Sequence, residues 1–310
     1  MIPNDENMIR LDVLAFLATH QLIIPDTCNS DIIKGFGSGF LLRHKERLFF
    51  VTADHVVHID DHDSSNETGQ RIGIDYFPQI VTNNRVKGEL LSINIPVSGF
   101  YHLTSFGFDK DSLNNPEKFI SIFNKIIEGD IDINDENLPI DVRIASLPDM
   151  AISEIKEPLS IPILSNQVVM QNGDVLIQEG TQKLVLYSSP VKQFNSNNNY
   201  LVAGTICNEI KNSVILNRIN VLHDALIFDR WDNDGYAILR IPKLVDYQYW
   251  AGLSGAPILD DEGLLAGMLV RGPEREPFIT AIPIEKIIWF LDIIIKDYNE
   301  YNNIVRSLVK

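Results

Sequence analysis

Short runs of β-forming residues, each bounded by turn residues, recur along most of the chain. The first two, 35–42 and 47–57, flank a charged turn and predict a β-hairpin. Further runs follow Ile144, each bounded by Gly, Pro, Asn or Asp: KLVLYSS, YLVAGTI, SVILNRI, ALIFD, YAILRI, APILD, LLAGMLV and FITAIPI. Many short strands separated by turns are the pattern of a β-barrel or a β-sandwich, so we expect a mainly β fold.

Helical patterns stand at three places outside these runs. Residues 9–19 carry apolar side chains at spacings of three and four, which predicts a short N-terminal helix. The polar, acidic segment at about 109–138 contains a helical stretch, and we interpret it as a helical insertion on the domain surface. Residues 284–310 predict a C-terminal helix packed on the β-domain. The expected organisation is therefore an N-terminal helix with its lead-in over 1–34, a domain over 35–283, and the C-terminal helix.

Asparagine dominates one connection between two of the β-runs. The stretch FNSNNNY, from Phe194 to Tyr200, consists largely of Asn and Ser, which are turn-forming residues. We interpret it as a mobile loop without a fixed structure.

The charge of the chain argues against a nucleic-acid partner. Its 26 Lys and Arg residues stand against 42 Asp and Glu residues, and the net charge of -16 repels phosphate backbones. The apolar run Val13–Leu17 is too short to span a membrane, and no basic region precedes a small-residue cleavage site. We therefore expect a cytoplasmic protein without membrane contact, in which Cys28 and Cys207 are free thiols.

One serine stands in a glycine-rich turn towards the end of the sequence. The stretch YWAGLSGAPILDDEG, Tyr249–Gly263, places Ser254 within Gly-Leu-Ser-Gly. A serine hydroxyl is a nucleophile only if a base takes its proton and a third group orients that base. The last histidine, His223, precedes this serine, which excludes the α/β-hydrolase order. No acid before His55 lies in a glycine-rich turn, which argues against the subtilisin order, so the order left is His, Asp, Ser.

Two further segments contain candidates for the base and the acid. His55 ends the β-run FFVTADHVV, and Asp149 lies in LPDMAISEI, where apolar neighbours hold a carboxylate away from bulk water. Asp141, in PIDVRIAS, also precedes an apolar run and is the alternative acid. His58 lies close to His55 but lacks its Thr-Ala-Asp context.

Three segments resemble a known family. GSGFLL…FVTADHVV, DMAI and GLSGAPILDDEGLLAG look like the histidine, aspartate and serine motifs of trypsin-like (chymotrypsin-fold) serine proteases. The bacterial intracellular and periplasmic members, including the high-temperature-requirement proteases, are more similar to this sequence than digestive trypsins are. The resemblance spans roughly 35–284. It implies two antiparallel β-barrels and a serine protease activity that needs no cofactor.

By this resemblance, His55 is the general base, Asp149 the carboxylate that orients it, and Ser254 the nucleophile. The backbone amides of Gly252 and Ser254 form the oxyanion hole, which stabilises the charge of the tetrahedral intermediate. Asp141 fits less well, because Val and Arg follow it where the family has an apolar and a small residue.

The same motif alignment predicts the substrate-binding residues. The base of the primary pocket lies near Gln248 and its wall near Val270 and Gly272, with Phe278 or Thr280 opposite. Because no acidic residue falls at the base, we expect a medium apolar or small neutral side chain before the scissile bond, rather than Lys or Arg.

The sequence also departs from the family. Leu253 stands where digestive trypsins carry the aspartate that receives a new N-terminus, so activation by N-terminal cleavage is not expected. We hypothesise control by loop ordering or by a protein partner.

The insertion at 109–138 has two interpretations. It is either a docking element for a partner or a solvated surface segment that binds none. An acidic cluster follows His55, but its residues lack the spacing of known metal ligands, so we predict no metal site there. Its members are His58, Asp60, Asp61, His62 and Asp63.

The predicted function is a serine endopeptidase that acts on protein or peptide substrates through an acyl-enzyme. Two alternatives stay open. One is a catalytically silent protease-fold module that serves for binding or as a scaffold, and the other is an esterase on the same fold. Labelling by an active-site phosphonate separates the first from an enzyme, and hydrolysis of small esters without peptide cleavage identifies the second.

Overall fold

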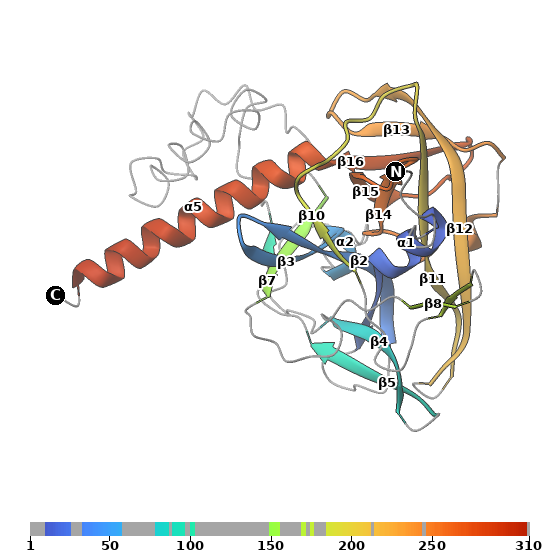
Figure 1. Ribbon diagram of the computed structural model, residues 1–310, viewed down its shortest axis with the longest axis horizontal. Helices are drawn as coiled ribbons and strands as arrows, with labels where there is room; N and C mark the ends of the chain where they lie inside the picture. The colour runs from blue at the N-terminus through green and yellow to red at the C-terminus, as the bar shows by residue number, and fades with distance from the viewer. Residues whose placement is uncertain are drawn as a thin grey trace, which may run out of the picture.

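The described part of the computed structural model is mainly β, and two sheets contain most of its strands (Figure 1). The predicted helical insertion, Asp141, Cys28 and the acidic cluster after His55 lie outside the described residues. The described residues are 10–25, 33–57, 78–86, 89–96, 100–102, 149–155, 169–171, 174–176, 184–211, 214–243 and 246–308.

Six strands in the C-terminal part of the chain form a closed β-barrel. Neighbours pair in the order β11-β12-β13-β16-β15-β14, and β14 pairs back onto β11 through Tyr200↔Asp260 and Leu201↔Leu259. All six strands contribute apolar side chains to the enclosed core. The strands are β11 (Asn199–Lys211), β12 (Val214–Trp231), β13 (Ala237–Arg240), β14 (Pro257–Asp260), β15 (Leu265–Arg271) and β16 (Phe278–Pro283).

The N-terminal part forms a curled, mostly antiparallel sheet of eight strands. The order is β5-β4-β1-β2-β3-β7-β6, and β10 pairs in parallel with β2. The sheet buries Phe40, Phe49 and Phe50 completely. Its strands are β1 (Thr19–Pro25), β2 (Ile33–His44), β3 (Arg47–Thr52), β4 (Gln79–Val86), β5 (Glu89–Pro96), β6 (Phe100–His102), β7 (Ala151–Ile155) and β10 (Val185–Tyr187); β8 (Val169–Gln171) and β9 (Asp174–Leu176) form a separate pair.

The predicted hairpin around the charged turn is confirmed. β2 and β3 pair from Gly39↔Thr52 to His44↔Arg47. The two residues between the strands, Lys45 and Glu46, both have positive φ, at 44° and 64°. Positive φ at both central positions is the geometry of a type I′ turn, whose twist matches that of the flanking strands.

The helices pack on the two sheets. The predicted N-terminal helix is confirmed as α1, which contacts β11. The predicted C-terminal helix is confirmed as α5, which follows β16 directly and buries Ile287 and Leu291. His44 Nε2, in the β2–β3 turn, donates to Asp292 Oδ1 of α5 at 2.7 Å. The helices are α1 (Leu11–Ala18), α2 (Asp54–Val57), the 3-10 turn η4 (Tyr247–Tyr249) and α5 (Ile284–Leu308).

Two of the predicted β-runs, SVILNRI and ALIFD, are parts of one strand. β12 continues through the intervening residues, because β11 pairs with both parts. The register shifts where Tyr200↔Leu226 is followed by Val202↔His223, and Ala225 has a φ of 53°. The polar residues that suggested a turn therefore form a β-bulge, which leaves the strand continuous.

The expectation of a mobile loop at 194–200 is wrong. Phe194 and Tyr200 are buried, and their ring centroids lie 5.0 Å apart. The Tyr200 hydroxyl accepts the Asn195 backbone N–H at 2.8 Å, and the Asn195 side chain accepts the Asn197 N–H at 2.9 Å. The aromatic residues at both ends anchor the segment in the barrel, which composition alone does not reveal.

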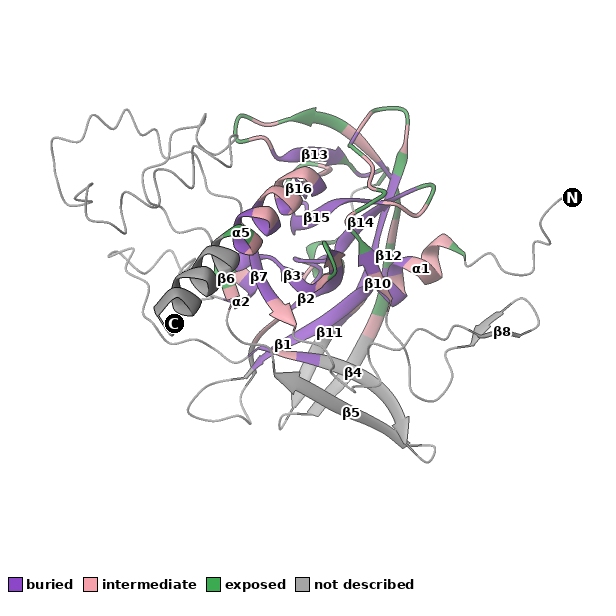
Figure 2. Ribbon diagram, turned by 60° about the vertical axis from the view of Figure 1, so that its left-hand side comes forward, coloured by how far each residue is buried: buried purple, intermediate pink, exposed green. Residues whose placement is uncertain are grey.

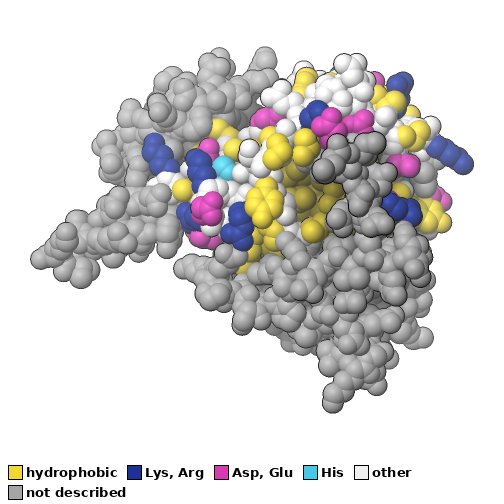
Figure 3. All heavy atoms as spheres, viewed as in Figure 1, with side chains coloured by type: hydrophobic (Ala, Val, Ile, Leu, Met, Phe, Trp, Pro, Cys, Tyr) yellow, Lys and Arg dark blue, Asp and Glu magenta, His cyan; other side chains and the backbone are white. Residues whose placement is uncertain are grey.

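The described charges are dispersed on the visible face. Figure 3 shows Lys and Arg side chains interspersed with Asp and Glu around hydrophobic side chains. Among the residues that the structure describes, no group of three or more His, Cys, Asp and Glu is arranged to hold a metal ion. Within the same residues, every helix is too short or too polar to cross a membrane.

The two sheets meet in the buried middle of the molecule. Figure 2 shows β2 and β3 of the curled sheet and β14 and β15 of the barrel as largely buried strands. A closed six-stranded barrel beside a curled half-barrel, with a few helices, is a chymotrypsin-like arrangement and confirms the predicted fold class. The N-terminal barrel is a half-barrel in the described residues, because its end strands β5 and β6 do not pair with each other there.

Candidate active site

His55 and Asp149 meet because the strands next to them in the sequence are paired. β3 ends at Thr52, β7 begins at Ala151, and these two residues are partners in an antiparallel ladder. The residues that follow β3 and those that precede β7 therefore emerge at the same edge of the sheet. The chain turns into α2 directly after β3, so His55 lies in a short helix and not at the end of a β-run.

Two hydrogen bonds join the histidine to the aspartate. His55 Nδ1 lies 2.6 Å from Asp149 Oδ2, and the His55 backbone N–H donates to Oδ1 at 3.0 Å. A carboxylate only accepts, so Nδ1 carries the hydrogen and Nε2 is left to accept a proton. The side chains of His55 and Asp149 are 29% and 12% exposed, so the pair is shielded but open on the histidine side.

Tyr236 holds the backbone of the aspartate from the other sheet. Its hydroxyl oxygen accepts the Asp149 backbone N–H at 3.0 Å. Burial raises the pKa of Tyr236 to about 12, so the hydroxyl stays protonated at neutral pH. The Asp232 carboxylate accepts the backbone N–H of Tyr236 at 2.7 Å, which fixes the start of β13. The sequence analysis missed Tyr236, because a tyrosine 87 positions from its partner carries no local signal.

Ser254 lies in a tight turn between η4 and β14. The Leu253 N–H donates to the Trp250 carbonyl at 3.0 Å, and the Ala256 N–H donates to the Leu253 carbonyl at 2.8 Å. Gly252 has a φ of 94°, a left-handed conformation that glycine adopts without steric cost. The turn is therefore built from backbone hydrogen bonds, and the predicted glycine stands where a positive φ is required.

A chain of hydrogen bonds joins this turn to the strand that leads to the histidine. The Ser38 N–H of β2 donates to the Ser254 carbonyl at 2.8 Å. The Thr52 hydroxyl, at the end of β3, donates to the Ser38 carbonyl at 2.7 Å. Thr52 is followed three residues later by His55. The structure thus joins His55 directly to Asp149 and connects the Ser254 turn to the end of β3, from which the chain continues to His55.

The hydroxyl and the backbone amides of the turn differ in their partners. The Ser254 hydroxyl donates to the Val270 carbonyl at 3.0 Å. A hydroxyl carries one hydrogen, so the side chain has to rotate before that hydrogen reaches a base. The backbone N–H groups of Gly252 and Ser254, the predicted oxyanion donors, have no hydrogen-bond acceptor among the described residues. As far as the described residues go, nothing accepts from these two N–H groups, which is the condition that an oxyanion hole requires.

The predicted substrate-binding residues lie around the same turn. Gln248 is exposed in η4, Val270 is buried near the end of β15, and Gly272 follows that strand. A Cβ added to Gly272 would lie 2.8 Å from Trp250 Cβ. Trp250, which is only 3% exposed, is therefore the residue of the turn that packs against the predicted wall.

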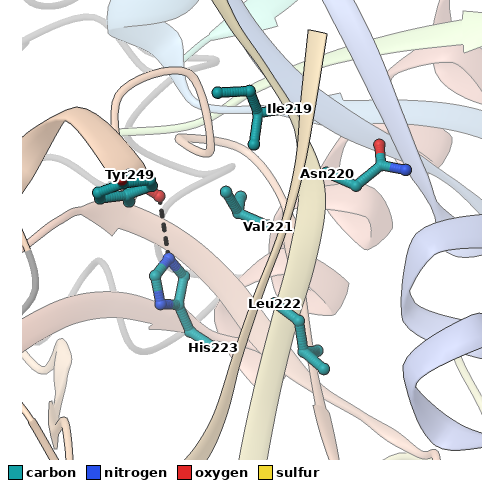
Figure 4. Close-up of a pocket in the computed structure, with 6 residues that line it drawn as sticks. All are labelled: Ile219, Asn220, Val221, Leu222, His223 and Tyr249. Atoms are coloured by element: carbon teal, nitrogen blue, oxygen red, sulfur yellow. Dashed lines mark hydrogen bonds between the residues drawn. The ribbon is translucent and has the colours of Figure 1, made fainter.

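A pocket of about 310 Å³ lies between η4 and β12 (Figure 4). The His223 Nε2–H donates to the Tyr249 carbonyl at 2.9 Å, and its ring stacks on Trp250 at a centroid distance of 3.6 Å. Burial lowers the pKa of His223, which favours the neutral ring. This contact, which the sequence analysis missed, ties the turn before the serine to β12. The pocket is lined by Ile219, Asn220, Val221, Leu222, His223 and Tyr249.

Gly255 is expected to be the least replaceable residue of the turn. Its φ is 92°, and an added Cβ would lie 2.0 Å from the Ser38 carbonyl oxygen. The backbone of β2 cannot move aside as a flexible side chain can. We therefore expect Gly255→Ala to lower the free energy of unfolding, measured by urea denaturation, by about 3 kcal/mol.

Gly235→Ala is the matched control for this prediction. Gly235 also has a positive φ, 74°, but its added Cβ would meet Lys286 Nζ, the end of a flexible side chain, at 3.0 Å. We expect this variant to lose about 1 kcal/mol, the cost of the left-handed conformation. Equal losses in the two variants would contradict the role of the β2 backbone.

Comparisons with known proteins find a likeness in structure only. No protein-family model matches the chain, and no curated protein matches it in sequence. The serine endoprotease from Yersinia pestis is similar with a TM-score of 0.42 and 14% identity, covering 93% of this chain and 68% of that chain. The tobacco vein mottling virus protease is similar with a TM-score of 0.41 and 7% identity, covering 90% of this chain and 81% of that chain. At such identities, function has to be argued from the residues of this chain.

Proposed function

We propose that the protein is a serine endopeptidase that cleaves protein or peptide substrates through an acyl-enzyme. One observation carries this proposal: the hydrogen-bonded His55–Asp149 pair lies at the sheet edge that Ser38 and Thr52 join to the Ser254 turn. A base with its orienting acid, a hydroxyl and backbone amide donors are the groups that acyl transfer requires.

The proposed first step transfers the serine proton to the histidine. The Ser254 side chain rotates away from the Val270 carbonyl, and its oxygen forms a bond to the carbonyl carbon of the substrate. Its proton passes to His55 Nε2, and the π electron pair of the carbonyl moves onto the substrate oxygen. Asp149 accepts the Nδ1–H throughout and stabilises the imidazolium that forms.

The proposed second step releases the amine and leaves an ester. The C–N bond breaks as the amine takes the proton from the imidazolium, and water then hydrolyses the acyl-enzyme by the same sequence. In both tetrahedral intermediates, the N–H groups of Gly252 and Ser254 donate to the negative oxygen. One such donor typically contributes about 10²–10³-fold to kcat.

The proposed substrate strand runs beside the end of β15. The support is the position of Val270, whose carbonyl lies 3.0 Å from the Ser254 hydroxyl, and of Gly272 just after it. Trp250 occupies space next to Gly272, and Gln248 carries no charge. We therefore propose a small neutral or medium apolar residue before the scissile bond.

We also propose a cytoplasmic location and control by loop ordering or a protein partner. Leu253 is fully buried in the barrel core, so apolar packing and not an ion pair holds this part of the turn. The contact between His223 and the Tyr249 carbonyl links the turn to the surface of β12. A partner that alters this contact would act directly on the backbone that carries the serine.

Covalent labelling tests the proposed function. The purified protein is treated with a fluorophosphonate and digested, and the modified peptide is identified by mass spectrometry. We expect the label on Ser254. In a folded His55→Ala variant, we expect the labelling rate to fall by about 10²–10⁴-fold, because the general base is lost.

The other outcomes separate the alternatives. If the folded natural protein is not labelled, the endopeptidase proposal fails and a catalytically silent scaffold is favoured. If it is labelled and hydrolyses 4-nitrophenyl butyrate but does not cleave fluorescent casein, an esterase is favoured.

A further inference from the structure

Ser38 lies in β2, but both of its hydrogen-bond donors point to the turn that precedes β14 of the barrel. Its hydroxyl donates to the Gly252 carbonyl at 2.7 Å, and its backbone N–H donates to the Ser254 carbonyl at 2.8 Å. The residue is fully buried, so water does not compete for these bonds. One residue of the curled sheet thus holds two carbonyls of the turn that carries the proposed nucleophile.

These bonds fix two peptide groups. A peptide group is planar, so fixing its carbonyl also fixes the N–H of the next residue. The Gly252 carbonyl shares a plane with the Leu253 N–H, which donates within the turn at 3.0 Å. The Ser254 carbonyl shares a plane with the Gly255 N–H, which donates to β15 at 2.7 Å. In each of the two planes, Ser38 thus holds the carbonyl and a second hydrogen bond holds the N–H.

The Gly252 and Ser254 N–H groups, which have no acceptor in the described residues, belong to peptides next to these two fixed planes. The Gly252 N–H belongs to the peptide before the first fixed plane, and the Ser254 N–H belongs to the peptide between the two. The Ser254 N–H is also held through its own peptide, because the Leu253 carbonyl accepts the Ala256 N–H at 2.8 Å. The Gly252 N–H keeps its direction because the plane that follows it is fixed. Donors that are aligned in advance need no reorganisation when negative charge develops.

Ser38 is itself held from the side of the histidine. The Thr52 hydroxyl donates to the Ser38 carbonyl at 2.7 Å, and Thr52 pairs with Gly39 in the β2–β3 ladder. Gly255 leaves room for the same carbonyl, because a Cβ there would lie 2.0 Å from its oxygen. The hydroxyl of Ser38 is therefore presented to the turn by a fixed backbone.

We propose that Ser38 is a positioning residue for the oxyanion-binding amides of Gly252 and Ser254. This rests on the proposed function, because it assigns a role within the same acyl transfer. Ser38 does not touch the reacting atoms and acts through the turn. Loss of its hydroxyl leaves the peptide between Gly252 and Leu253 held only through the Leu253 N–H, so this peptide can tilt and the neighbouring donors, the Gly252 N–H above all, lose alignment.

The test is Ser38→Ala in the full-length chain, with 4-nitrophenyl butyrate as the substrate and fluorophosphonate as the label. We expect kcat and the labelling rate to fall together by about 10–100-fold, less than the loss of a whole donor. KM is expected to change by less than about threefold, because the ground-state carbonyl does not use these donors fully. The pH at half-maximal kcat is expected to stay the same, because the base is untouched.

Thr19→Val is the matched control. The Thr19 hydroxyl is also buried, and its oxygen lies 2.9 and 2.7 Å from the Ala15 and Ala203 carbonyl oxygens, which share its one hydrogen outside the serine turn. We expect this variant to lose stability like Ser38→Ala but to keep kcat. If Ser38→Ala does not fold, Ser38→Gly, which also removes the hydroxyl and adds no volume, is judged by the same criteria.

The outcomes distinguish this proposal from the proposed function. A natural protein that neither hydrolyses the ester nor takes the label overturns both. An active natural protein whose folded Ser38 variant keeps its kcat, or changes only in KM, overturns the positioning role alone. A fall in kcat of the same size in Thr19→Val would also overturn it, because general destabilisation would then explain the loss.

Discussion

Replacement of Ser254 by alanine is expected to lower kcat for ester and peptide hydrolysis by about 10⁶-fold, which is the usual cost of losing the nucleophile of a serine protease. The hydroxyl is the atom that forms the acyl-enzyme, and nothing else in the turn substitutes for it. The measurement compares 4-nitrophenyl butyrate and fluorescent casein hydrolysis by the natural and substituted chains. The residual rate over water would come from binding and from the amide donors.

Stability separates this chemical effect from unfolding. The Ser254 hydroxyl makes one hydrogen bond, to the Val270 carbonyl, so its loss is expected to change the free energy of unfolding by about 1 kcal/mol at most. Ser196→Ala, at an exposed position in the asparagine-rich loop, is the control for serine removal and is expected to keep full activity. Hydrolysis by purified Ser254→Ala above about one hundredth of the natural rate would exclude Ser254 as the nucleophile.

Replacement of Asp149 by asparagine is expected to lower kcat by about 10⁴-fold with little change in the fold. The asparagine fills the same space, and its backbone N–H still donates to the Tyr236 hydroxyl. Its side-chain amide, however, presents a donor where the carboxylate accepts the His55 Nδ1–H. The ring then favours the tautomer with hydrogen on Nε2, which cannot accept the serine proton. Steady-state kinetics with 4-nitrophenyl butyrate measure the loss.

Asp141→Asn is the matched control for this variant, because Asp141 is the other acid that the sequence allows. We expect it to retain kcat within about threefold, because the proposed mechanism assigns the orienting carboxylate to Asp149. A large loss in Asp141→Asn together with an active Asp149→Asn would reverse the assignment of the acid. Thermal unfolding of both variants shows whether either loss comes from the fold.

Local patterns in the sequence predicted the elements that depend on neighbouring residues. The hairpin between β2 and β3 follows from two short β-runs and a charged turn, which the structure narrows to Lys45 and Glu46. The helical spacing at the two ends predicted α1 and α5. The glycines around Ser254 predicted a turn, and in the structure Gly252 and Gly255 both have positive φ. In each case the signal and its cause lie within a few residues.

Predictions failed where a distant segment decides the local structure. The polar residues near His223 suggested a turn, but β12 continues because β11 pairs with it on both sides of a bulge. The segment from Phe194 to Tyr200 looked unstructured, but its aromatic ends are buried in the barrel. Neither the pairing partner nor the buried surface is visible in the residues themselves.

The sequence by itself determined the strand-rich fold class, the glycine-rich turn and a short set of candidates for base, acid and nucleophile. Only the tertiary structure decided which of these residues meet. The pairing of Thr52 with Ala151 places Asp149 against His55, and Ser38 and Tyr236 reach across from opposite sheets to hold the serine turn and the aspartate. Such contacts join residues far apart in the chain. They depend on strand register and on the packing of one sheet against the other, which no local pattern records.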